Sequence, residues 1–439
     1  MKILLVQPPV DYRVPRAFRT EGLGIAYIAS TLRCDGHDVE LLDAHCACLN
    51  LKETIREVLS RDFHALGITS ADDHRKAVLE IVSAVRRRRS DAIICAGGYL
   101  PTLSYEQLLR ACPELDFLVR GEGESTALEV FRRIEAGEDW KETPGVAFVH
   151  DGEIVTNPMP PLIEDLDSLP YPARDALIQA PPGVAKSAGV ATSRGCYHNC
   201  AFCCIRAFYG LHGRKPPRFR DPAKVVDEIE DVIAQTGLRE IRFIDDDFMG
   251  PGQKTLSRAR AIGREIIDRG VDIRFRLECR ADEVDEETLL VLKEAGLEEV
   301  FLGIESMIPR ALETFNKRTT VEQNLAAIDV VRGTGIKLRV GYIMFDPYIT
   351  MEELQEHLRV IKELGIDKDA EGSPAPFVTR LGIFRGTPIV EKLREDGLLR
   401  ENGFDLSYRF KEPVMGLLFQ GTLLLGRAST AFRRIGRKQ

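Results

Sequence analysis

Three cysteines stand close together in this chain, as Cys196, Cys200 and Cys203, within the stretch "TSRGCYHNCAFCCIRAFYG" at residues 192–210. Their C-x3-C-x2-C spacing indicates a metal site, because clustered thiols in a chain without an export signal stay reduced. Zinc sites usually add a second, distant cysteine pair, which does not follow here. A ferredoxin supplies four cysteines per cluster. Three thiolates on a cubane iron–sulfur cluster would leave one iron free for the amine and carboxylate of a small molecule.

The stretch resembles the radical S-adenosylmethionine (radical SAM) superfamily. The signature C-x3-C-x-aromatic-C of that family is present as Cys196, Cys200, Phe202 and Cys203. The resemblance implies that the three cysteines are catalytic, that they ligate a [4Fe–4S] cluster, and that SAM binds its open iron. Reductive cleavage of SAM would then yield a 5′-deoxyadenosyl radical, which removes hydrogen from an unactivated carbon.

Other motifs along residues 186–390 resemble the SAM-binding positions of the same family. They are "FIDDDF", "RLECR" and "GIES", each at the end of a β-like run. In the later "VGYIMFDP", Phe345 and Asp346 depart from the usual second glycine, and "FRGTP" resembles the loop after the sixth strand. The expected SAM contacts, besides Phe202, are Asp245, Asp246, Glu278, Arg280 and Glu305.

Some residues near these motifs have competing explanations. The triplet Asp245–Asp247 could bind a divalent cation or cap the next helix, although SAM contact is preferred in this fold. Cys204 could replace a ligand, but a buried small side chain is the favoured interpretation. Cys279 alternates with Glu278 and Arg280 along a predicted strand, so it is expected to pack in the core.

The elements that must position these residues form an α/β segment over 186–396. Strands are expected in "GVATSRG", "EIRFIDDD", "DIRFRLECR", "EEVFLGIES", "KLRVGYIMFDP" and "FVTRLGIFRGTP", with helical patterns between them. Six strand–helix units are too few for a complete eight-fold barrel. We therefore expect a partial (β/α)6 barrel with its polar residues at the carboxyl ends of the strands.

Residues 1–140 form an earlier α/β segment. The runs "KILLVQ", "DVELLDA", "ALGITSA", "AIICAGG" and "DFLVRG" are apolar enough for a parallel sheet covered on both faces, in a doubly wound, Rossmann-like arrangement. Such sheets bind ligands at the carboxyl ends of their strands, where four loops here are rich in small residues or glycine. Residues 141–185 are expected to be a hairpin with an Asp-Gly turn, followed by a proline-rich linker.

The first segment resembles the cobalamin-binding domain that precedes the radical domain in one large subclass of the family. The matching motifs are "LLVQPP", "GLGIAYIASTLRCDGHDVELLDA", "GITS", "AGGYLPT" and "VRGEGE". The resemblance implies a bound cobalamin at the carboxyl ends of the strands. The expected contacts are Gln7, Ser70, Asp72, Gly97, Gly98, Tyr99, Gly121 and Glu122.

The D-x-H-x-x-G motif that ligates cobalt from below is absent, because "PPVDYRVPRAFRT" after the first strand contains no histidine. His37 precedes the second strand, and Asp43 and His45 follow it, with Cys48 in place of the glycine. We expect no histidine ligand to cobalt, and we expect Ser70–Asp73 to face its lower side.

The two resemblances together imply a cobalamin-dependent radical SAM C-methyltransferase, in which cobalamin delivers a methyl group to a substrate carbon radical. A cyclase or ring-rearranging enzyme of the same subclass is the first alternative. A non-catalytic corrinoid or cluster carrier is the second, and the polar set Glu278, Arg280 and Glu305 argues against it. A methylthiotransferase is disfavoured, because Cys34, Cys46, Cys48 and Cys95 do not supply the extra cysteine cluster it would need.

Composition limits the partners. The 439 residues carry a net charge of −8, which does not favour nucleic acid. No apolar run reaches the ~18 residues of a membrane span, so a cytoplasmic enzyme is expected. Its expected partners are a small-molecule or peptide substrate and an electron donor of the flavodoxin or ferredoxin type. The C-terminal extension 397–439 includes a stretch that would suit a membrane surface, but a helix packed on the barrel is preferred.

Overall fold

The structure is a computed structural model that describes residues 1–10, 19–184, 186–213, 215–365 and 379–423. The chain divides into two compact units. Unit 1 contains residues 1–195, 207–245 and 264–275, and unit 2 contains residues 196–206, 246–263 and 276–439. The units therefore interleave along the chain.

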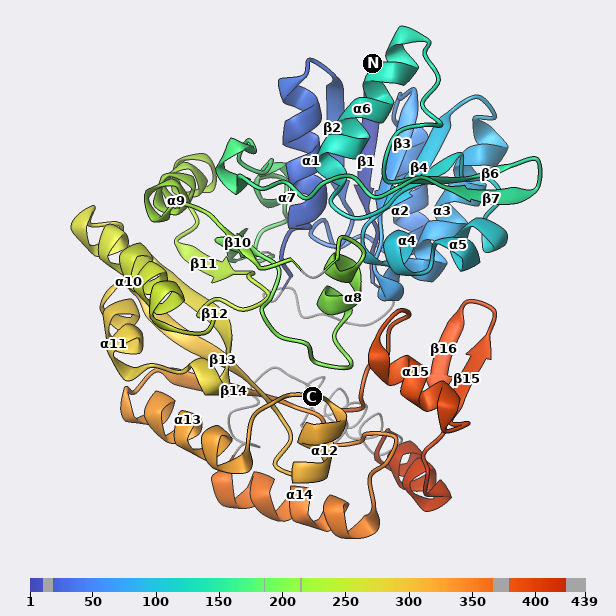
Figure 1. Cartoon of the computed structure of the whole chain (residues 1–439). Coiled ribbons are helices and arrows are strands. Elements are labelled where there is room, and N and C mark those ends of the chain that lie inside the picture. The colour runs from blue at the N-terminus through green and yellow to red at the C-terminus, as the bar shows by residue number, and fades with distance from the viewer. Residues whose placement is uncertain (11–18, 185, 214, 366–378, 424–439) are drawn as a thin grey trace, which may run out of the picture. The chain divides into compact units, whose positions relative to one another are not determined.

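Unit 1 is built on a seven-stranded sheet in the order β2-β1-β3-β4-β5-β6-β7, whose first five strands are parallel (Figure 1). Helix α1 packs beside α6, and α2 packs beside α3. Right-handed crossovers in this strand order place those two pairs on opposite faces. The parallel elements are β1 (Lys2–Gln7), α1 (Leu23–Cys34), β2 (Asp38–Asp43), α2 (Leu51–Ser60), β3 (Ala65–Thr69), α3 (Arg75–Arg88), β4 (Ile93–Gly97), α4 (Tyr99–Leu103), α5 (Tyr105–Ala111), β5 (Phe117–Val119) and α6 (Gly123–Ala136).

The apolar runs of the sequence form the core of this sheet. Strand β1 is buried from Ile3 to Val6, as a strand covered on both faces must be. The predicted hairpin is present as β6 (Val146–His150) and β7 (Glu153–Thr156). It adds to the sheet by antiparallel pairing of β6 with β5. Trp140 packs between Phe117 and Phe148 at this end of the sheet.

A second sheet carries the elements around the three cysteines, in the order β14-β13-β12-β11-β8. The registers of β8 with β11 and of β13 with β14 are parallel. Its strands are β8 (Ala188–Val190), β11 (Glu240–Phe243), β12 (Arg274–Arg280), β13 (Leu297–Glu305) and β14 (Lys337–Tyr342). At the position of the expected sixth strand, a single parallel bridge joins Phe345 to Arg380. Residues 377–378 of that strand lie outside the described part of the chain.

Helices follow the strands as the sequence pattern predicts. Asp221 caps α9, with a proline at its first turn, while Thr320 and Thr350 form capping boxes on α13 and α14. The helices are α7 (Asp175–Ile178), α8 (Cys204–Gly210), α9 (Pro222–Thr236), α10 (Gln253–Asp268), α11 (Glu286–Glu294), α12 (Pro309–Thr314), α13 (Val321–Gly333), α14 (Met351–Leu364) and α15 (Pro388–Glu395). Two short antiparallel pairs were not predicted, namely β9 (Ser193–Arg194) with β10 (Arg218–Phe219) and β15 (Leu399–Asn402) with β16 (Asp405–Tyr408).

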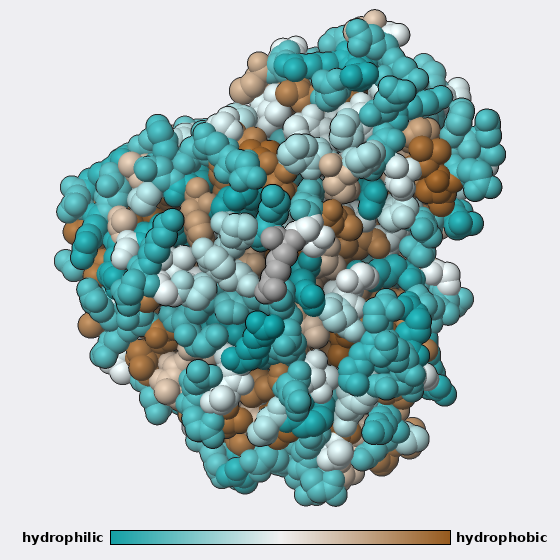
Figure 2. All heavy atoms as spheres, in the orientation of Figure 1, coloured by the Kyte–Doolittle hydropathy of each residue, from teal (hydrophilic) through white to brown (hydrophobic). Residues whose placement is uncertain are grey.

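The face of the molecule shown in Figure 2 is mostly hydrophilic, with small separated hydrophobic patches. Among the described residues, no helix is both long enough and apolar enough to cross a membrane. The end of the chain is helical from residue 413 to 423, where Met415 is buried and Leu417 is exposed. The helix expected at residues 417–438, either packed or on a membrane surface, lies largely within residues 424–439, which are outside the described part of the chain.

Candidate active site

The loop that carries the three cysteines is attached to neighbouring elements of unit 2 by its backbone. The Ala201 amide donates to the Phe315 carbonyl at 2.7 Å, and the Ile389 amide donates to the Ala201 carbonyl at 3.0 Å. The ring of Phe202 packs edge-on against Phe315, with 5.5 Å between the ring centroids. The aromatic position of the signature is therefore an anchor of the loop in the core near α12 and α15.

The three thiols are partly buried and influence one another. Burial raises the pKa of Cys203 to about 11, and the neighbouring Cys200 adds to that shift. Burial also raises the pKa of Cys196, with Asp247 and Cys203 contributing in the same direction. An iron ligand must be a thiolate, so bound iron would offset this cost by favouring deprotonation. This donor set fits a cluster held by three cysteines.

Arg280, an expected SAM contact at the end of β12, lies against the cysteine loop. Its Nη1 donates to the Cys200 sulfur at 3.4 Å. Its Nε and Nη2 bind the Asp282 carboxylate at 2.9 and 3.2 Å, and Nη2 also donates to the Lys317 carbonyl at 2.6 Å. The guanidinium is thus committed to the loop and its surroundings.

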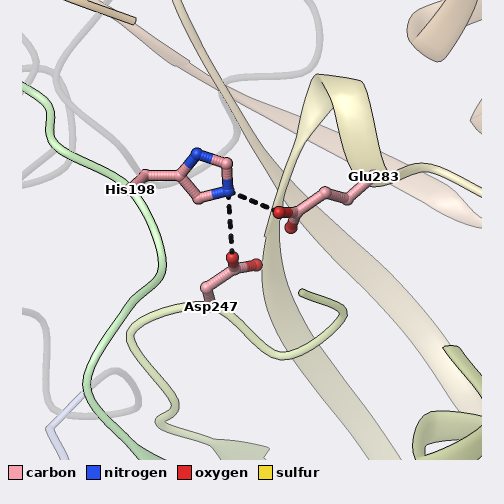
Figure 3. A group of neighbouring side chains, drawn as sticks. All are labelled: His198, Asp247 and Glu283. Carbon is pink, nitrogen blue, oxygen red and sulfur yellow. Dashed lines mark hydrogen bonds and ion pairs between the residues drawn. The ribbon is translucent and has the colours of Figure 1, made fainter. Parts of the chain in front are cut away.

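A histidine and two carboxylates also meet beside the loop (Figure 3). The His198 Nε2 lies 2.5 Å from Glu283 Oε1 and 3.9 Å from Asp247 Oδ2. These groups could together hold a metal ion. Burial raises the pKa of both carboxyls, and the proximity of Glu283 raises that of Asp247 further. Sequence analysis missed His198 and Glu283. The only signal for His198 was its place inside the cysteine motif.

The other expected SAM contacts differ in their surroundings. Asp245 is buried and accepts hydrogen bonds from the Thr192 amide and hydroxyl, at 3.3 and 2.7 Å, and from the Ser193 hydroxyl. Asp246 is exposed. The aspartate triplet does not cap α10, because that helix begins at residue 253.

Glu278 and Glu305 lie at the carboxyl ends of β12 and β13. Glu278 is half-buried, and its carbonyl accepts from the Phe248 amide at 3.0 Å. Glu305 has a left-handed backbone with a φ of 67° at an irregularity of β13, and its Oε1 lies 3.3 Å from Lys317 Nζ. Lys317 is 4% exposed and was not identified from the sequence.

Two further cysteines lie next to the expected ligands in the sequence. Cys279 is buried, and burial raises its thiol pKa well above the usual value. Cys204 is half-buried and begins α8. All ten cysteines are free thiols.

In unit 1, the expected cobalamin contacts gather at the carboxyl ends of β1, β3, β4 and β5. Gln7 ends β1, and its Nε2 lies 3.2 Å from the His74 Nε2. The other ring nitrogen of His74, Nδ1, accepts from the Ala71 amide at 3.1 Å. Both ring nitrogens of His74 therefore lie within hydrogen-bond distance of protein groups.

The turn after β4 is shaped by two glycines. Gly98 has a φ of 102°, and a Cβ on it would lie 2.8 Å from the carbonyl oxygen of Ser70. Ser70 is buried, and its amide donates to the Gly97 carbonyl at 2.8 Å. Tyr99 follows in α4, is 38% exposed and stacks on Phe208. The helix α4 replaces part of an expected loop. This edge of small residues leaves room for a broad ligand close to the backbone. Asp72 is half-buried and lies in the turn after β3.

The loop after β5 is tied to the segment that precedes the cysteines. Gly121 has a φ of 77°, and its amide donates to the Thr102 hydroxyl at 3.0 Å. The Glu122 carboxylate pairs with Arg218 at 2.7 and 2.9 Å and with Arg194 at 3.3 Å. Burial favours the neutral carboxyl, but these arginines hold the pKa of Glu122 below its usual value. The carboxylate is therefore occupied by protein groups.

The two histidines near β2 lie at opposite ends of that strand. His37 precedes β2, at the opposite end of that strand, and contacts the N-terminal amine at 3.2 Å. The Asp43 carboxylate accepts from the Gly22 amide at 2.9 Å. Burial lowers the pKa of His45 to about 4, and Cys48 has a φ of 59°. The loop 11–18, where a lower ligand motif would end, lies outside the described residues.

Two family models match the chain, each over one of its sequence segments. The model of the radical SAM superfamily matches residues 190–361, and that of the B12 binding domain matches residues 11–131. An uncharacterized methyltransferase of Pyrococcus horikoshii is 31% identical over 376 residues, covering 84% of this chain and 79% of that protein.

A second relative, the anaerobic magnesium-protoporphyrin IX monomethyl ester cyclase of Cereibacter sphaeroides, is 29% identical over 92% of this chain, which spans 65% of that longer protein. Among solved structures, the cobalamin-dependent S-adenosylmethionine radical enzyme OxsB superposes with a TM-score of 0.78 at 22% identity, over 96% of this chain and 66% of OxsB. That likeness confirms the predicted fold, a Rossmann-like sheet followed by a radical SAM barrel.

Proposed function

Because the chain belongs to the radical SAM superfamily and carries its B12 binding domain, we propose that it is a cobalamin-dependent C-methyltransferase. The observation that carries the proposal is the 31% identity to a methyltransferase over 84% of this chain. The site supports the proposal, because the same chain carries a three-cysteine loop for the cluster and a sheet edge lined with glycines for cobalamin.

The cofactors supply the reactive chemistry, and the protein supplies their binding sites. When bound, the iron–sulfur cluster supplies an electron that cleaves SAM, and the cobalamin supplies the methyl group. In this proposal Cys196, Cys200 and Cys203 hold the cluster, while Glu305 and the exposed Asp246 bind SAM. Gly97 and Gly98 let the corrin lie close to the backbone, as do Ser70 and Gly121.

The lower face of the cobalamin would meet protein groups that do not ligate cobalt. His74 is the histidine of the loop after β3, and its Nδ1 already accepts from the Ala71 amide. The Gln7 amide nitrogen lies 3.2 Å from its other ring nitrogen, so both nitrogens already face protein groups. A cobalamin held beside these residues would supply the methyl group.

A cyclase is the second candidate, favoured by the similarity to a cyclase over 92% of this chain. Both candidates need the cluster, and only the methyltransferase needs methyl transfer from SAM to cobalamin. The test is anaerobic reconstitution with iron, sulfide and hydroxocobalamin, followed by reduction in the presence of SAM that carries a deuterated methyl group.

A methyltransferase is expected to bind cobalt and to form S-adenosylhomocysteine together with deuteromethyl cobalamin. Cleavage of SAM to 5′-deoxyadenosine alone, without S-adenosylhomocysteine, would point to the cyclase. A protein that binds the cofactors but cleaves no SAM would be a carrier. Each outcome is read by mass spectrometry without knowledge of the substrate.

Several further features belong to the same proposal. The substrate is a small molecule or peptide, and the electron comes from a flavodoxin or ferredoxin-type donor. The enzyme works in the cytoplasm, which agrees with ten free thiols. Its sequence domains are a cobalamin-binding domain at 1–140, a hairpin and linker at 141–185, the barrel at 186–396 and an extension at 397–439.

A further inference from the structure

We propose that the turn from Arg280 to Glu283, at the carboxyl end of β12, positions the cysteine loop by contacting it at Cys200 and at His198. Arg280 reaches the sulfur of Cys200, and Glu283 reaches the loop through His198, next to Cys196. The inference rests on the cluster of the proposed function but does not depend on methyl transfer.

The Arg280 arm is a direct contact to a ligand atom. Its Nη1 lies 3.4 Å from the Cys200 sulfur, within hydrogen-bond distance for sulfur. The arginine is 5% exposed, so solvent weakens this contact little. Hydrogen bonds to ligand sulfurs tune the reduction potential of iron–sulfur clusters. Arg280 is therefore placed to stabilise the more negative, reduced cluster.

The rest of the guanidinium is fixed, so the contact has a defined direction. Asp282 binds Nε and Nη2 in a bidentate pair, and the Lys317 carbonyl accepts from Nη2 at 2.6 Å. A planar guanidinium can satisfy all three partners at once, whereas an ammonium group on a flexible chain cannot hold them in one plane. Asp282 also balances the charge of the arginine.

The second arm uses both the side chain and the backbone of His198. Its Nε2 lies 2.5 Å from Glu283 Oε1, and its backbone amide donates to the Cys196 sulfur at 3.5 Å. Glu283 is 1% exposed at its side chain and belongs to the short 3-10 turn Ala281–Glu283. Holding the imidazole thus fixes the amide that faces the sulfur.

Asp247 completes the surroundings of this arm, with Oδ2 4.0 Å from the Cys196 sulfur. Oδ1 of Asp247 and Oε2 of Glu283 are buried without a hydrogen-bond partner. The same three side chains could bind a cation instead (Figure 3). A cation bound there would compete with the contact between Glu283 and His198. The experiment below therefore measures zinc binding at His198.

The experiment uses the full-length chain, reconstituted with iron and sulfide alone. The measurements are iron content, the midpoint potential of the cluster and the EPR spectrum of its reduced form. The variants are R280Q, R280K, D282N and E283Q. R264Q removes an exposed arginine from α10 and is the matched control.

R280Q is expected to shift the midpoint potential to more negative values and to change the EPR spectrum, because the charge-assisted hydrogen bond to the sulfur is lost. R280K should recover part of the shift. D282N removes the carboxylate that balances the arginine charge, so its potential should move to more positive values. E283Q should slow cluster assembly and increase iron loss to a chelator. R264Q should behave as wild type.

An R280Q cluster with the potential and spectrum of wild type would overturn the Arg280 arm. If R280Q takes up no iron, the midpoint potentials of R280K and D282N test the Arg280 arm instead. Stoichiometric zinc binding at His198 in a variant lacking the three motif cysteines would overturn the Glu283 arm. A wild-type cluster without methyl transfer to cobalamin would refute only the methyltransferase, whereas a wild-type chain that binds no iron would refute both.

Discussion

Cys203 and Cys204 are adjacent in the sequence but sit in different surroundings. The Cys203 amide donates to the Cys200 carbonyl at 3.2 Å, which closes a tight turn between two of the expected ligands. Cys204 is the first residue of α8. Residues adjacent in the sequence at a helix start do not face the same side, so we expect only Cys203 to join the three-thiol set.

We therefore expect C203S to lose the cluster and C204S to keep it. Serine has nearly the volume of cysteine, so neither change should disturb packing. The measurement is iron and sulfide content after anaerobic reconstitution, with C279S as a buried control. Full cluster content in C203S together with loss in C204S would reverse the ligand assignment.

His357 gives a residue-scale prediction about pH. Its side chain is fully buried in α14, with Nδ1 2.5 Å from the Tyr342 hydroxyl, and burial lowers its pKa to about 4. The unfolded chain binds a proton near pH 6.5 and the folded chain only near 4. The stability contributed by neutral His357 is therefore present above pH 6.5 and is lost as the pH falls toward 4.

Relative to H357Q, the wild type should lose about 2 kcal/mol of unfolding free energy between pH 7 and pH 5. Urea unfolding of both proteins at each pH measures this difference. A difference between the two proteins that does not change with pH would show that His357 ionises equally well in the folded state.

At the scale of elements, the turn between β4 and α4 depends on one glycine. Gly98 combines a φ of 102° with a ψ of −164°, a conformation open essentially to glycine. An added Cβ would also meet the Ser70 backbone. By contrast, Gly137 ends α6 in the ordinary left-handed region, with no atom near its Cβ position.

G98A should therefore cost at least about 2 kcal/mol and weaken cobalamin binding, whereas G137A should cost about 1 kcal/mol and leave binding unchanged. Urea unfolding and the absorption of bound cobalamin report the two effects separately. Equal losses in both variants would show that the edge of the sheet tolerates a side chain at position 98.

Most strands, helices and turns were predictable from the sequence, because the patterns that specify them are local. The buried run of β1 and the Asp-Gly turn of the hairpin are set by neighbours in the sequence. The short pair β9 with β10 was missed, because two-residue strands carry no period. The contacts of Glu122 with Arg218 and of Arg280 with Cys200 join residues far apart in the chain. Nothing local distinguishes such arginines from surface ones, so their protein partners could not be predicted from the sequence.

At the scale of the whole molecule, buried ion pairs join parts of unit 1 that the sequence assigns to different domains. Arg174 is fully buried and binds Glu21 at 2.7 Å and Glu228 at 2.6 Å. Arg220 also pairs with Glu228, and Arg194 pairs with Glu124 at 2.6 Å. Removing one partner of a buried pair costs about 3–5 kcal/mol, because the other charge is left uncompensated.

A fragment of residues 1–185 should consequently be much less stable than a fragment of residues 1–245, although both contain the whole first sheet. The shorter fragment lacks Arg194 and Arg218, the partners of Glu122 and Glu124. In that fragment Arg174 keeps Glu21 but loses Glu228. Fluorescence of Trp140, the single tryptophan, follows urea unfolding of each fragment. Equal midpoints would support the expected domain limit at 185.

The same ion pairs bear on how such enzymes are recombined. A new cobalamin-binding half joined at residue 185 would bring its own carboxylates to Arg194 and Arg218, which pair here with Glu122 and Glu124. It would also bring its own residue at position 174 to Glu228. Productive crossover points would therefore lie beyond α9, so that charges and their partners are inherited together. Two competent halves from different parent enzymes, joined at residue 185, would make a hybrid whose buried charges lack their partners.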